Sequence, residues 1–126
     1  MSAAVVKQPL LPGATLGVMG GGQLGRMFVH AAQQAGYFTA VLDPDADSPA
    51  GRVSHHHVHA DYLDSDGLAR LSRLADAITT EFENVPARAL ASLAGDVPVA
   101  PGAEAVSIAQ DRIREKAHFV RCGVAC

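Results

Sequence analysis

The sequence predicts an α/β domain built on a doubly wound parallel sheet of about five strands. Short apolar stretches rich in β-forming residues recur along the chain, and helical apolar periodicity follows several of them. Strands joined by helices need crossover connections, which run the strands parallel and place helices on both faces of the sheet. We therefore expect a Rossmann-like domain with the strand order 3-2-1-4-5.

Each of the predicted strands ends at glycine, proline or an acidic turn residue. The strands are expected at 15–19, 37–43, 55–60, 76–82 and 97–100. The last of these is the shortest and carries prolines inside and after it.

The first helix begins at Gln23 and stops before Gly36, which suits a left-handed position at a helix C-terminus. Its apolar residues recur at helical spacing and form one continuous stripe. The members of this stripe are Leu24, Met27, Phe28, Ala31, Ala32 and Ala35.

Later helices are predicted from their capping residues. Asp64 or Ser65 caps the second helix, and Pro86 suits the first turn of a third helix that ends at Gly95. After residue 102 the pattern changes to two linking helices, the second of which starts at Asp111. We therefore divide the chain into a flexible leader (1–14), the α/β domain (15–102) and C-terminal linking helices (103–126).

The composition excludes several classes of protein. Apolar residues make up 48% and charged residues 18% of the 126 residues, which is ordinary globular usage. The net charge of −3, with only a short basic stretch near the C-terminus, argues against a nucleic-acid partner. No apolar run approaches the roughly 20 residues of a membrane span, and the N-terminus lacks a signal-peptide pattern. We expect a cytoplasmic protein that binds neither nucleic acid nor membrane.

A glycine-rich turn follows the first strand. Gly20, Gly22 and Gly25 match G-x-G-x-x-G between a strand and a helix, which is the context of a dinucleotide-binding turn. Asp43 ends the second strand, where such proteins place a ribose-binding carboxylate. The residues alone therefore allow an NAD-binding module of an oxidoreductase, or a turn with a purely structural role.

Two groups of charged residues bear on this choice. Glu81 and Glu83 lie at the end of the fourth strand, beside the same crevice as the glycines. A carboxylate there suits a ligand with amine or hydroxyl donors and would repel a pyrophosphate, although both residues also fit a solvated loop.

Arg112 and Lys116 lie near a helix start, where cations oppose the helix dipole, so an anionic partner would help to explain them. A plain solvated helix face is the alternative.

Four motifs together carry a family resemblance. GVMGGGQLGRM, VLDPDADSPA, TTEFENVP and IAQDRIREK occur in this order along residues 15–124. Their order and spacing resemble the N-terminal part of the N5-carboxyaminoimidazole ribonucleotide synthases, ATP-grasp enzymes of purine biosynthesis. The joint occurrence of the four motifs is more specific than the glycine pattern alone.

The resemblance implies an activity and a set of ligands. Enzymes of this family use ATP and Mg²⁺ to activate bicarbonate as carboxyphosphate, which then carboxylates the exocyclic amine of 5-aminoimidazole ribonucleotide. The matching domain is a pre-ATP-grasp domain that contributes to the ribonucleotide pocket. The resemblance is also compatible with a homodimer of the intact enzyme.

The family's site residues carry over to positions in the matched motifs. The resemblance implies that Gln23 and Leu24 contact the ribonucleotide and that Gly22 allows its approach. It further implies that Glu81 hydrogen-bonds the substrate at ribose hydroxyls or at the amine, with Glu83 as the second acidic candidate. Two basic residues are candidates for contacting the ATP phosphates from the second linking helix. These are Arg112 and, as the weaker candidate, Lys116.

Family members are considerably longer than this sequence, and most of the ATP and Mg²⁺ site lies in the part that follows. We therefore interpret the sequence as one part of a ligase, with no catalytic residue of its own and no activity alone. A non-catalytic interaction fragment is a further alternative.

The histidines at 55, 56, 57 and 59 suggest a metal site, but on a strand His56 faces away from the other three. No nearby residue completes a tetrahedral set, so we expect no metal site here.

Overall fold

The computed structural model describes residues 8–126, which contain the predicted parallel sheet. Four strands pair in the order β3-β2-β1-β4, and every pairing is parallel. This arrangement confirms the α/β fold class and the predicted order of the first four strands. The strands are β1 (Thr15–Met19), β2 (Phe38–Asp43), β3 (His56–His59) and β4 (Ala77–Thr80).

The stretch predicted as a fifth strand lies in the expected place beside β4, although it is reduced to one β-bridge. Val99 pairs parallel with Ile78. Ile78 donates its N–H to the Pro98 oxygen at 2.9 Å and accepts from the Ala100 N–H at 3.0 Å. Proline has no N–H for a ladder, so Pro98 and Pro101 limit this stretch to a single bridge.

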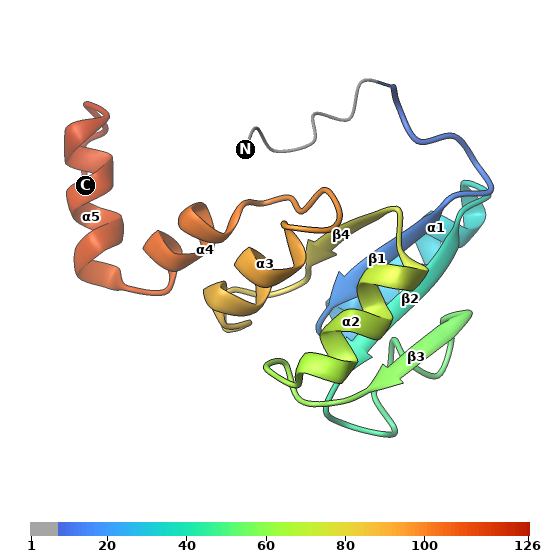
Figure 1. Cartoon of the computed structure of the whole chain (residues 1–126). Coiled ribbons are helices and arrows are strands. Elements are labelled where there is room, and N and C mark those ends of the chain that lie inside the picture. The colour runs from blue at the N-terminus through green and yellow to red at the C-terminus, as the bar shows by residue number, and fades with distance from the viewer. Residues whose placement is uncertain (1–7) are drawn as a thin grey trace.

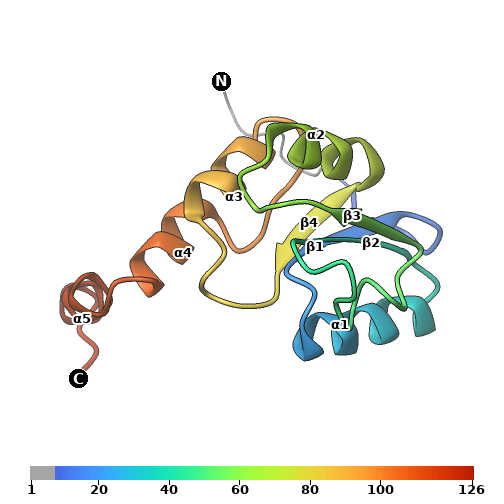
Figure 2. The ribbon, with the colours of Figure 1, turned by 90° about the horizontal axis from the view of Figure 1, so that it is seen from below.

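Helices cover both faces of the sheet. Figure 2 shows α1 (Gln23–Gln34) on one face and α2 (Ser65–Leu74) with α3 (Ala87–Leu93) on the other. Along β1 and β2 the side chains alternate between the two faces. Val18 and Val41 pack under α1, whereas Met19 and Leu42 join the larger core beneath α2 and α3.

Two further helices leave the sheet. α4 (Ala103–Ala109) packs on α3, and α5 (Arg112–Arg121) packs on α4 at the far end of the molecule, as Figure 1 shows. No residue of α5 is buried. The helices after residue 102 therefore extend away from the sheet, as linking helices would.

The apolar stripe predicted on α1 coincides only in part with the helix's buried face, which includes Ala32 and has Phe28 packed against it. Gly25, Val29 and Ala32 are buried, whereas Leu24 is 61% and Met27 67% exposed. The first turn approaches the sheet closely, because a Cβ on Gly25 would lie 2.7 Å from the Gly20 oxygen. Gly25, Val29 and Ala32 therefore face the sheet, and the Leu24 and Met27 side chains lie beside it.

The capping chemistry read from the sequence is confirmed for α2 and α5, whereas Pro86 is the N-cap before α3 and not part of its first turn. Asp64 caps α2 by accepting from the Gly67 N–H at 2.8 Å, and Asp111 caps α5 by accepting from the Ile113 N–H at 2.9 Å. Gly36 has the left-handed φ of 89° expected after α1. These ends depend on local side-chain and backbone chemistry, which is why the sequence locates them well.

Part of the predicted leader contacts the domain. The Gly13 N–H donates to the Gly36 oxygen at 2.9 Å, and the Tyr37 hydroxyl donates to the Leu10 oxygen at 2.8 Å. The leader's residues 1–7 lie outside the described part of the chain. Between residues 8 and 126 no helix has the length and apolar character needed to cross a bilayer.

Candidate functional site at the carboxyl edge of the sheet

The carboxyl ends of β1, β2 and β4 meet at one edge of the sheet, where ligands of parallel α/β proteins bind. We call residues 20–25 the glycine loop and residues 81–85 the acidic loop. Gly20 has φ 101°, a conformation that favours glycine. A Cβ there would also lie 2.6 Å from Cγ of Glu81, so the two loops touch at this position.

Glu81 bonds directly to the glycine loop. Its Oε1 accepts from the Gly22 N–H at 3.3 Å, and its Oε2 accepts from the Gly25 N–H at 2.9 Å. These N–H groups belong to the first turn of α1, whose partial positive charge favours an anion. The carboxylate of Glu81 therefore occupies the position that a dinucleotide's pyrophosphate would take.

Asp43 holds the glycine loop from the other side. Its Oδ2 accepts from the Gly21 N–H at 2.7 Å and from the Tyr62 hydroxyl at 3.1 Å, and its Oδ1 accepts from the Asp45 N–H at 2.8 Å. Only 8% of Asp43 is exposed. Protein donors thus occupy both oxygens of this carboxylate, which argues against the ribose-binding role considered for Asp43.

Tyr62 completes this arrangement. Burial and the negative charge of Asp43 raise the pKa of the Tyr62 phenol well above its usual value, so the phenol stays a donor to Asp43. Its ring centroid lies 6.1 Å from that of Phe82 in the acidic loop. Tyr62 thus connects the end of β2 to the loop after β4.

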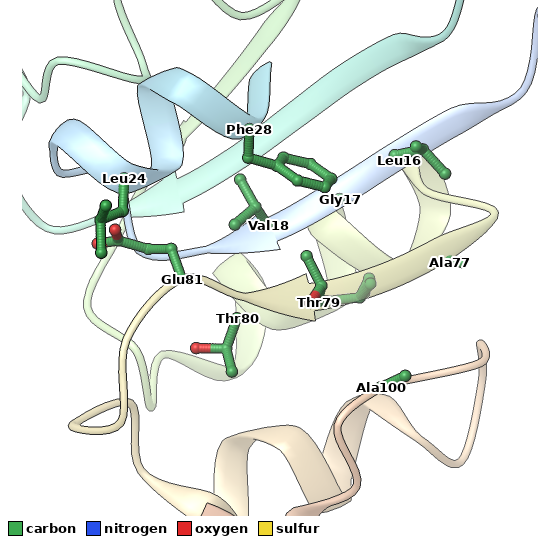
Figure 3. Close-up of a pocket in the computed structure, with 11 residues that line it drawn as sticks. Leu16, Gly17, Val18, Leu24, Phe28, Ala77, Thr79, Thr80, Glu81 and Ala100 are labelled. Atoms are coloured by element: carbon green, nitrogen blue, oxygen red, sulfur yellow. The ribbon is translucent and has the colours of Figure 1, made fainter. Parts of the chain in front are cut away.

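Gln23 and Leu24 present the open side of the glycine loop. Both are exposed, and Figure 3 shows the Leu24 side chain beside Glu81. Within residues 8–126 their backbone N–H groups have no hydrogen-bond partner. The loop therefore offers a ligand two N–H donors next to a carboxylate acceptor.

Two cavities adjoin Glu81. The larger, of about 440 Å³, runs over β1 and β4 on the face that α1 leaves uncovered, between Leu24, Phe28 and Thr79 (Figure 3). The smaller, of about 380 Å³, lies between the acidic loop and α4 and is lined by Phe82 and Glu83. Glu81 borders both cavities and is the acidic residue they share.

The other predicted site residues lie farther from the glycine loop. Glu83 is exposed in the acidic loop, and Lys116 is exposed on α5. The Arg112 Nη1 donates to Oε2 of Glu115 at 2.6 Å, while its side chain stays 77% exposed. Glu115 is thus an anionic partner for Arg112 within the same helix. Because α5 stands away from the sheet (Figure 1), Arg112 and Lys116 do not meet the glycine loop in this chain.

The family model described as the ribonucleotide synthetase preATP-grasp domain matches residues 13–110. The chain belongs to this family.

Related proteins extend the match beyond the domain itself. The chain is 45% identical over 118 residues to an N5-carboxyaminoimidazole ribonucleotide synthase of Brucella melitensis, covering 94% of this chain and 33% of that protein. It is similar to an ADP complex of N5-carboxyaminoimidazole ribonucleotide synthetase, with TM-score 0.89, 38% identity, and coverage of 94% of this chain and 31% of that one.

A third similar structure is the Aspergillus clavatus N5-carboxyaminoimidazole synthase in complex with ADP and 5-aminoimidazole ribonucleotide. Its TM-score is 0.80 at 33% identity, and the match covers 89% of this chain and 30% of that one. The chain therefore spans about a third of the length of the relatives it matches. The resemblance seen in the four sequence motifs is confirmed.

The preATP-grasp domain contains two residues whose contacts the sequence did not single out. Tyr62 donates to Asp43, and the Gln110 Nε2 donates to the backbone oxygens of Glu83 and Val85. Neither residue takes part in a periodic pattern. Gln110 stands in the AQDR segment directly before the α5 cap, and only its position in that motif marked it.

The histidines of the β3 region bond to protein groups. His55 accepts from the Thr39 N–H through Nδ1 at 3.2 Å, and His59 donates from Nε2 to the Pro44 oxygen at 2.9 Å. His57 Nε2 lies 3.5 Å from the Ser48 hydroxyl. These contacts tie the edge strand to β2 and to the loop that follows it, which explains three of the four histidines as parts of the fold.

Proposed function

We propose that this chain is the ribonucleotide-binding domain of an N5-carboxyaminoimidazole ribonucleotide synthase. Such an enzyme carboxylates 5-aminoimidazole ribonucleotide with bicarbonate at the expense of ATP. The proposal rests on one observation above the others, the seating of the Glu81 carboxylate on the N-terminal turn of α1.

That carboxylate distinguishes the two ligand classes that a glycine-rich turn can serve. A pyrophosphate needs the N–H groups of Gly22 and Gly25 and would meet a negative charge at that place, so an NAD-binding module fits poorly. A ribonucleotide offers hydroxyl and amine donors instead. A carboxylate has about four acceptor sites, and Glu81 uses two of them on the glycine loop.

Each site residue has a specific role in this proposal. Glu81 accepts a hydrogen bond from a ribose hydroxyl or from the amine of the substrate, and Glu83 is the second acidic contact. Gln23 and Leu24 contact the ribonucleotide from the first turn of α1, and Gly22 leaves room for its approach. The support comes from the two free N–H groups there and from the Aspergillus clavatus relative, which binds 5-aminoimidazole ribonucleotide.

The ATP side of the site includes α5 in this proposal. Arg112 and Lys116 contact the ATP phosphates, and Arg112 exchanges Glu115 for the nucleotide when ATP is present. Among residues 8–126 no three acidic, histidine or cysteine side chains converge. We therefore assign the Mg²⁺ ions, the bicarbonate and most of the ATP site to the remainder of the enzyme, and we expect the 126 residues alone to be inactive. A cytoplasmic homodimer is the form we propose for the intact enzyme.

A chimaera tests the function directly. The chain replaces the N-terminal third of the Brucella melitensis relative, which it matches over 118 residues. We expect ATP hydrolysis that depends on both 5-aminoimidazole ribonucleotide and bicarbonate. The Glu81→Ala variant should need more ribonucleotide for half-maximal hydrolysis, whereas Glu104→Ala, an exposed change on α4, should not. An unchanged requirement in Glu81→Ala would refute the site assignment.

The interaction-fragment alternative keeps one observation in its favour. On α5, Ile113 is 81% and Val120 is 65% exposed. Clustered exposed apolar side chains commonly mark an interface. Light scattering over a concentration series tests this alternative, because self-association that Ile113→Ser and Val120→Ser abolish would support it and a constant monomer mass would reject it.

A further inference from the structure

The acidic loop lacks the main-chain bonds that hold the glycine loop. Its last main-chain bond runs from the Glu81 N–H to the Met19 oxygen at 3.2 Å. In the described chain, the hydrogen bonds of residues 82–85 come from two side chains outside the loop. The Thr80 hydroxyl donates to the Phe82 oxygen at 3.1 Å, and Gln110 supplies the others.

The Gln110 side chain donates two hydrogen bonds to the acidic loop. Its Nε2 donates to the Glu83 oxygen at 2.5 Å and to the Val85 oxygen at 2.5 Å. Both acceptors are carbonyl oxygens, so only the NH₂ end of the carboxamide can face them, and each of its two protons has one acceptor. The Gln110 side chain thereby supplies donors to two loop carbonyl oxygens that receive no backbone N–H within residues 8–126.

The backbone of Gln110 is bonded to α4 and lies directly before α5, the helix proposed to contact ATP. The Gln110 N–H donates to the Val106 oxygen at 3.0 Å at the end of α4, and Val106 is 5% exposed. The next residue, Asp111, caps α5, and Arg112 begins it. The segment that places Arg112 therefore also places the loop that carries Glu83.

A cavity occupies the space between these two segments. The smaller cavity beside Glu81 is lined on one side by Phe82 and Glu83 and on the other by Val106 and Ala109. Gln110 joins the same two walls by its hydrogen bonds. A change in its side chain would therefore alter the separation of the walls, and with it the position of the acidic residues.

We propose that Gln110 is a positioning residue that couples the ribonucleotide-binding acidic loop to the ATP-side helix α5. The inference rests on the proposed function of the site. In this role Gln110 acts through the acidic loop and α5, not by contacting the substrate or ATP itself. It keeps Glu83 at the cavity and links its position to that of Arg112, so that ribonucleotide and ATP are bound by one connected unit.

The loop contact is tested first in the 126-residue chain by NMR relaxation. The backbone order parameters of Glu83 and Asn84 should be near the rigid value of about 0.85 and fall below about 0.6 in Gln110→Leu, which removes both donors. Gln110→Glu has nearly the same size but puts a carboxylate against two carbonyls, so it should release the loop as well. Ser72→Ala is the control, because that hydroxyl donates to the Ala69 oxygen within α2, away from both the acidic loop and α5. A loop as rigid in Gln110→Leu as in the wild type would overturn the proposal.

The coupling is tested in the chimaera with the Brucella melitensis relative. Gln110→Leu should raise the KM for 5-aminoimidazole ribonucleotide about tenfold, as expected for two lost hydrogen bonds, with kcat at saturating ribonucleotide nearly unchanged. In the unmodified chimaera the proposed coupling predicts that ATP tightens ribonucleotide binding, and Gln110→Leu should abolish this effect. A merely structural role would lower the melting temperature and leave the KM unchanged, and that result would overturn the coupling.

The two proposals fail in different ways. The proposed function would be contradicted if ATP hydrolysis by the unsubstituted chimaera did not depend on the ribonucleotide. The relaxation measurement does not depend on activity, so a loop that stays ordered in Gln110→Leu contradicts the further inference whatever the chimaera does.

Discussion

The two loops at the carboxyl edge of the sheet are held in different ways. The glycine loop bonds through its backbone. Gly20 is joined to β2, Gly21 to Asp43 and Ala50, and the N–H groups of Gly22 and Gly25 to Glu81. The acidic loop, from residue 82 onward, is held by side chains that reach it from outside. The glycine loop is therefore held in place by its own backbone hydrogen bonds, whereas the position of the acidic loop depends on neighbouring side chains.

The difference suits a site that binds a small substrate next to a nucleotide. A preorganised loop presents donors without an entropic cost at the moment of binding, whereas an adjustable loop can respond to a second ligand. Glu81 stands at the junction, since it begins the acidic loop and bonds to the fixed one. Substitutions in each loop should separate these roles.

The largest effect is expected for Gly20→Ala in the fixed loop. The change imposes a side chain at φ 101° and drives its Cβ to 2.6 Å from Cγ of Glu81. Strain and overpacking together should lower the free energy of unfolding by about 3 kcal/mol. Urea denaturation measures this loss. Gly102→Ala is the matched control, because nothing lies within 4 Å of its added Cβ and φ is −67°. Equal losses in the two variants would contradict the account of a fixed loop.

A smaller loss is expected for Asp43→Asn. The substitution keeps the size of the side chain but replaces one acceptor oxygen by an NH₂. In one orientation this NH₂ faces the donors of Gly21 and Tyr62, and in the other it faces the Asp45 N–H, so at least one donor loses its acceptor. Leaving buried donors unpaired should cost about 2 kcal/mol. Denaturation is again the measurement, with the exposed Asp96→Asn as control. If Asp43→Asn were as stable as the wild type, the role of Asp43 in holding the loop would be wrong.

Tyr62→Phe should cost about 1 kcal/mol at neutral pH, because one hydrogen bond to Asp43 is lost. The pH dependence is more specific. The folded state raises the pKa of Tyr62, so it keeps a proton that the unfolded chain releases above about pH 10. This contribution to stability is complete below that pH and is lost as the pH rises toward the folded-state value.

The wild type should therefore lose stability above about pH 10 more steeply than Tyr62→Phe does. Unfolding free energies of both proteins across that range measure the difference. Parallel curves would show that the Tyr62 proton is not held by the fold.

The smallest effect is expected outside both loops. Arg112→Gln removes an exposed ion pair with Glu115 and should change the free energy of unfolding by less than about 0.5 kcal/mol. Arg52→Gln, which removes the exposed pair with Asp47, is the control. A loss above about 1 kcal/mol in Arg112→Gln alone would show that Arg112 has a structural role rather than being available to a nucleotide.

The sequence predicts much of the fold because the signals are local. The first four strands, the cap at Asp64 and the cap at Asp111 follow from apolar runs and side chains that bond nearby N–H groups. The buried face of α1 was harder to predict. Periodicity groups Leu24 and Met27 on an apolar stripe, but it does not show that no helix within residues 8–126 covers the adjacent face of β4.

In the candidate site, too, features that depend on local signals could be predicted, and features that depend on distant segments could not. The crevice position of Glu81 follows from strand order, so the sequence could suggest it. Three other features depend on segments far apart in the chain. These are the hydrogen bonds of Glu81 to the glycine loop, the burial of Asp43 and the hydrogen bonds of Gln110 to the acidic loop. Asp43 in particular stands where a ribose-binding carboxylate belongs, and only the approach of Tyr62 and the glycine loop shows its different use.

The most direct test of the central claim is an NMR titration of the 126-residue chain with 5-aminoimidazole ribonucleotide and, separately, with NADH. The account predicts saturable shifts at the backbone amides of Gly22, Gln23 and Leu24 with the ribonucleotide, weakened in Glu81→Gln, and no such shifts with NADH. Shifts at these amides with NADH and none with the ribonucleotide would contradict it.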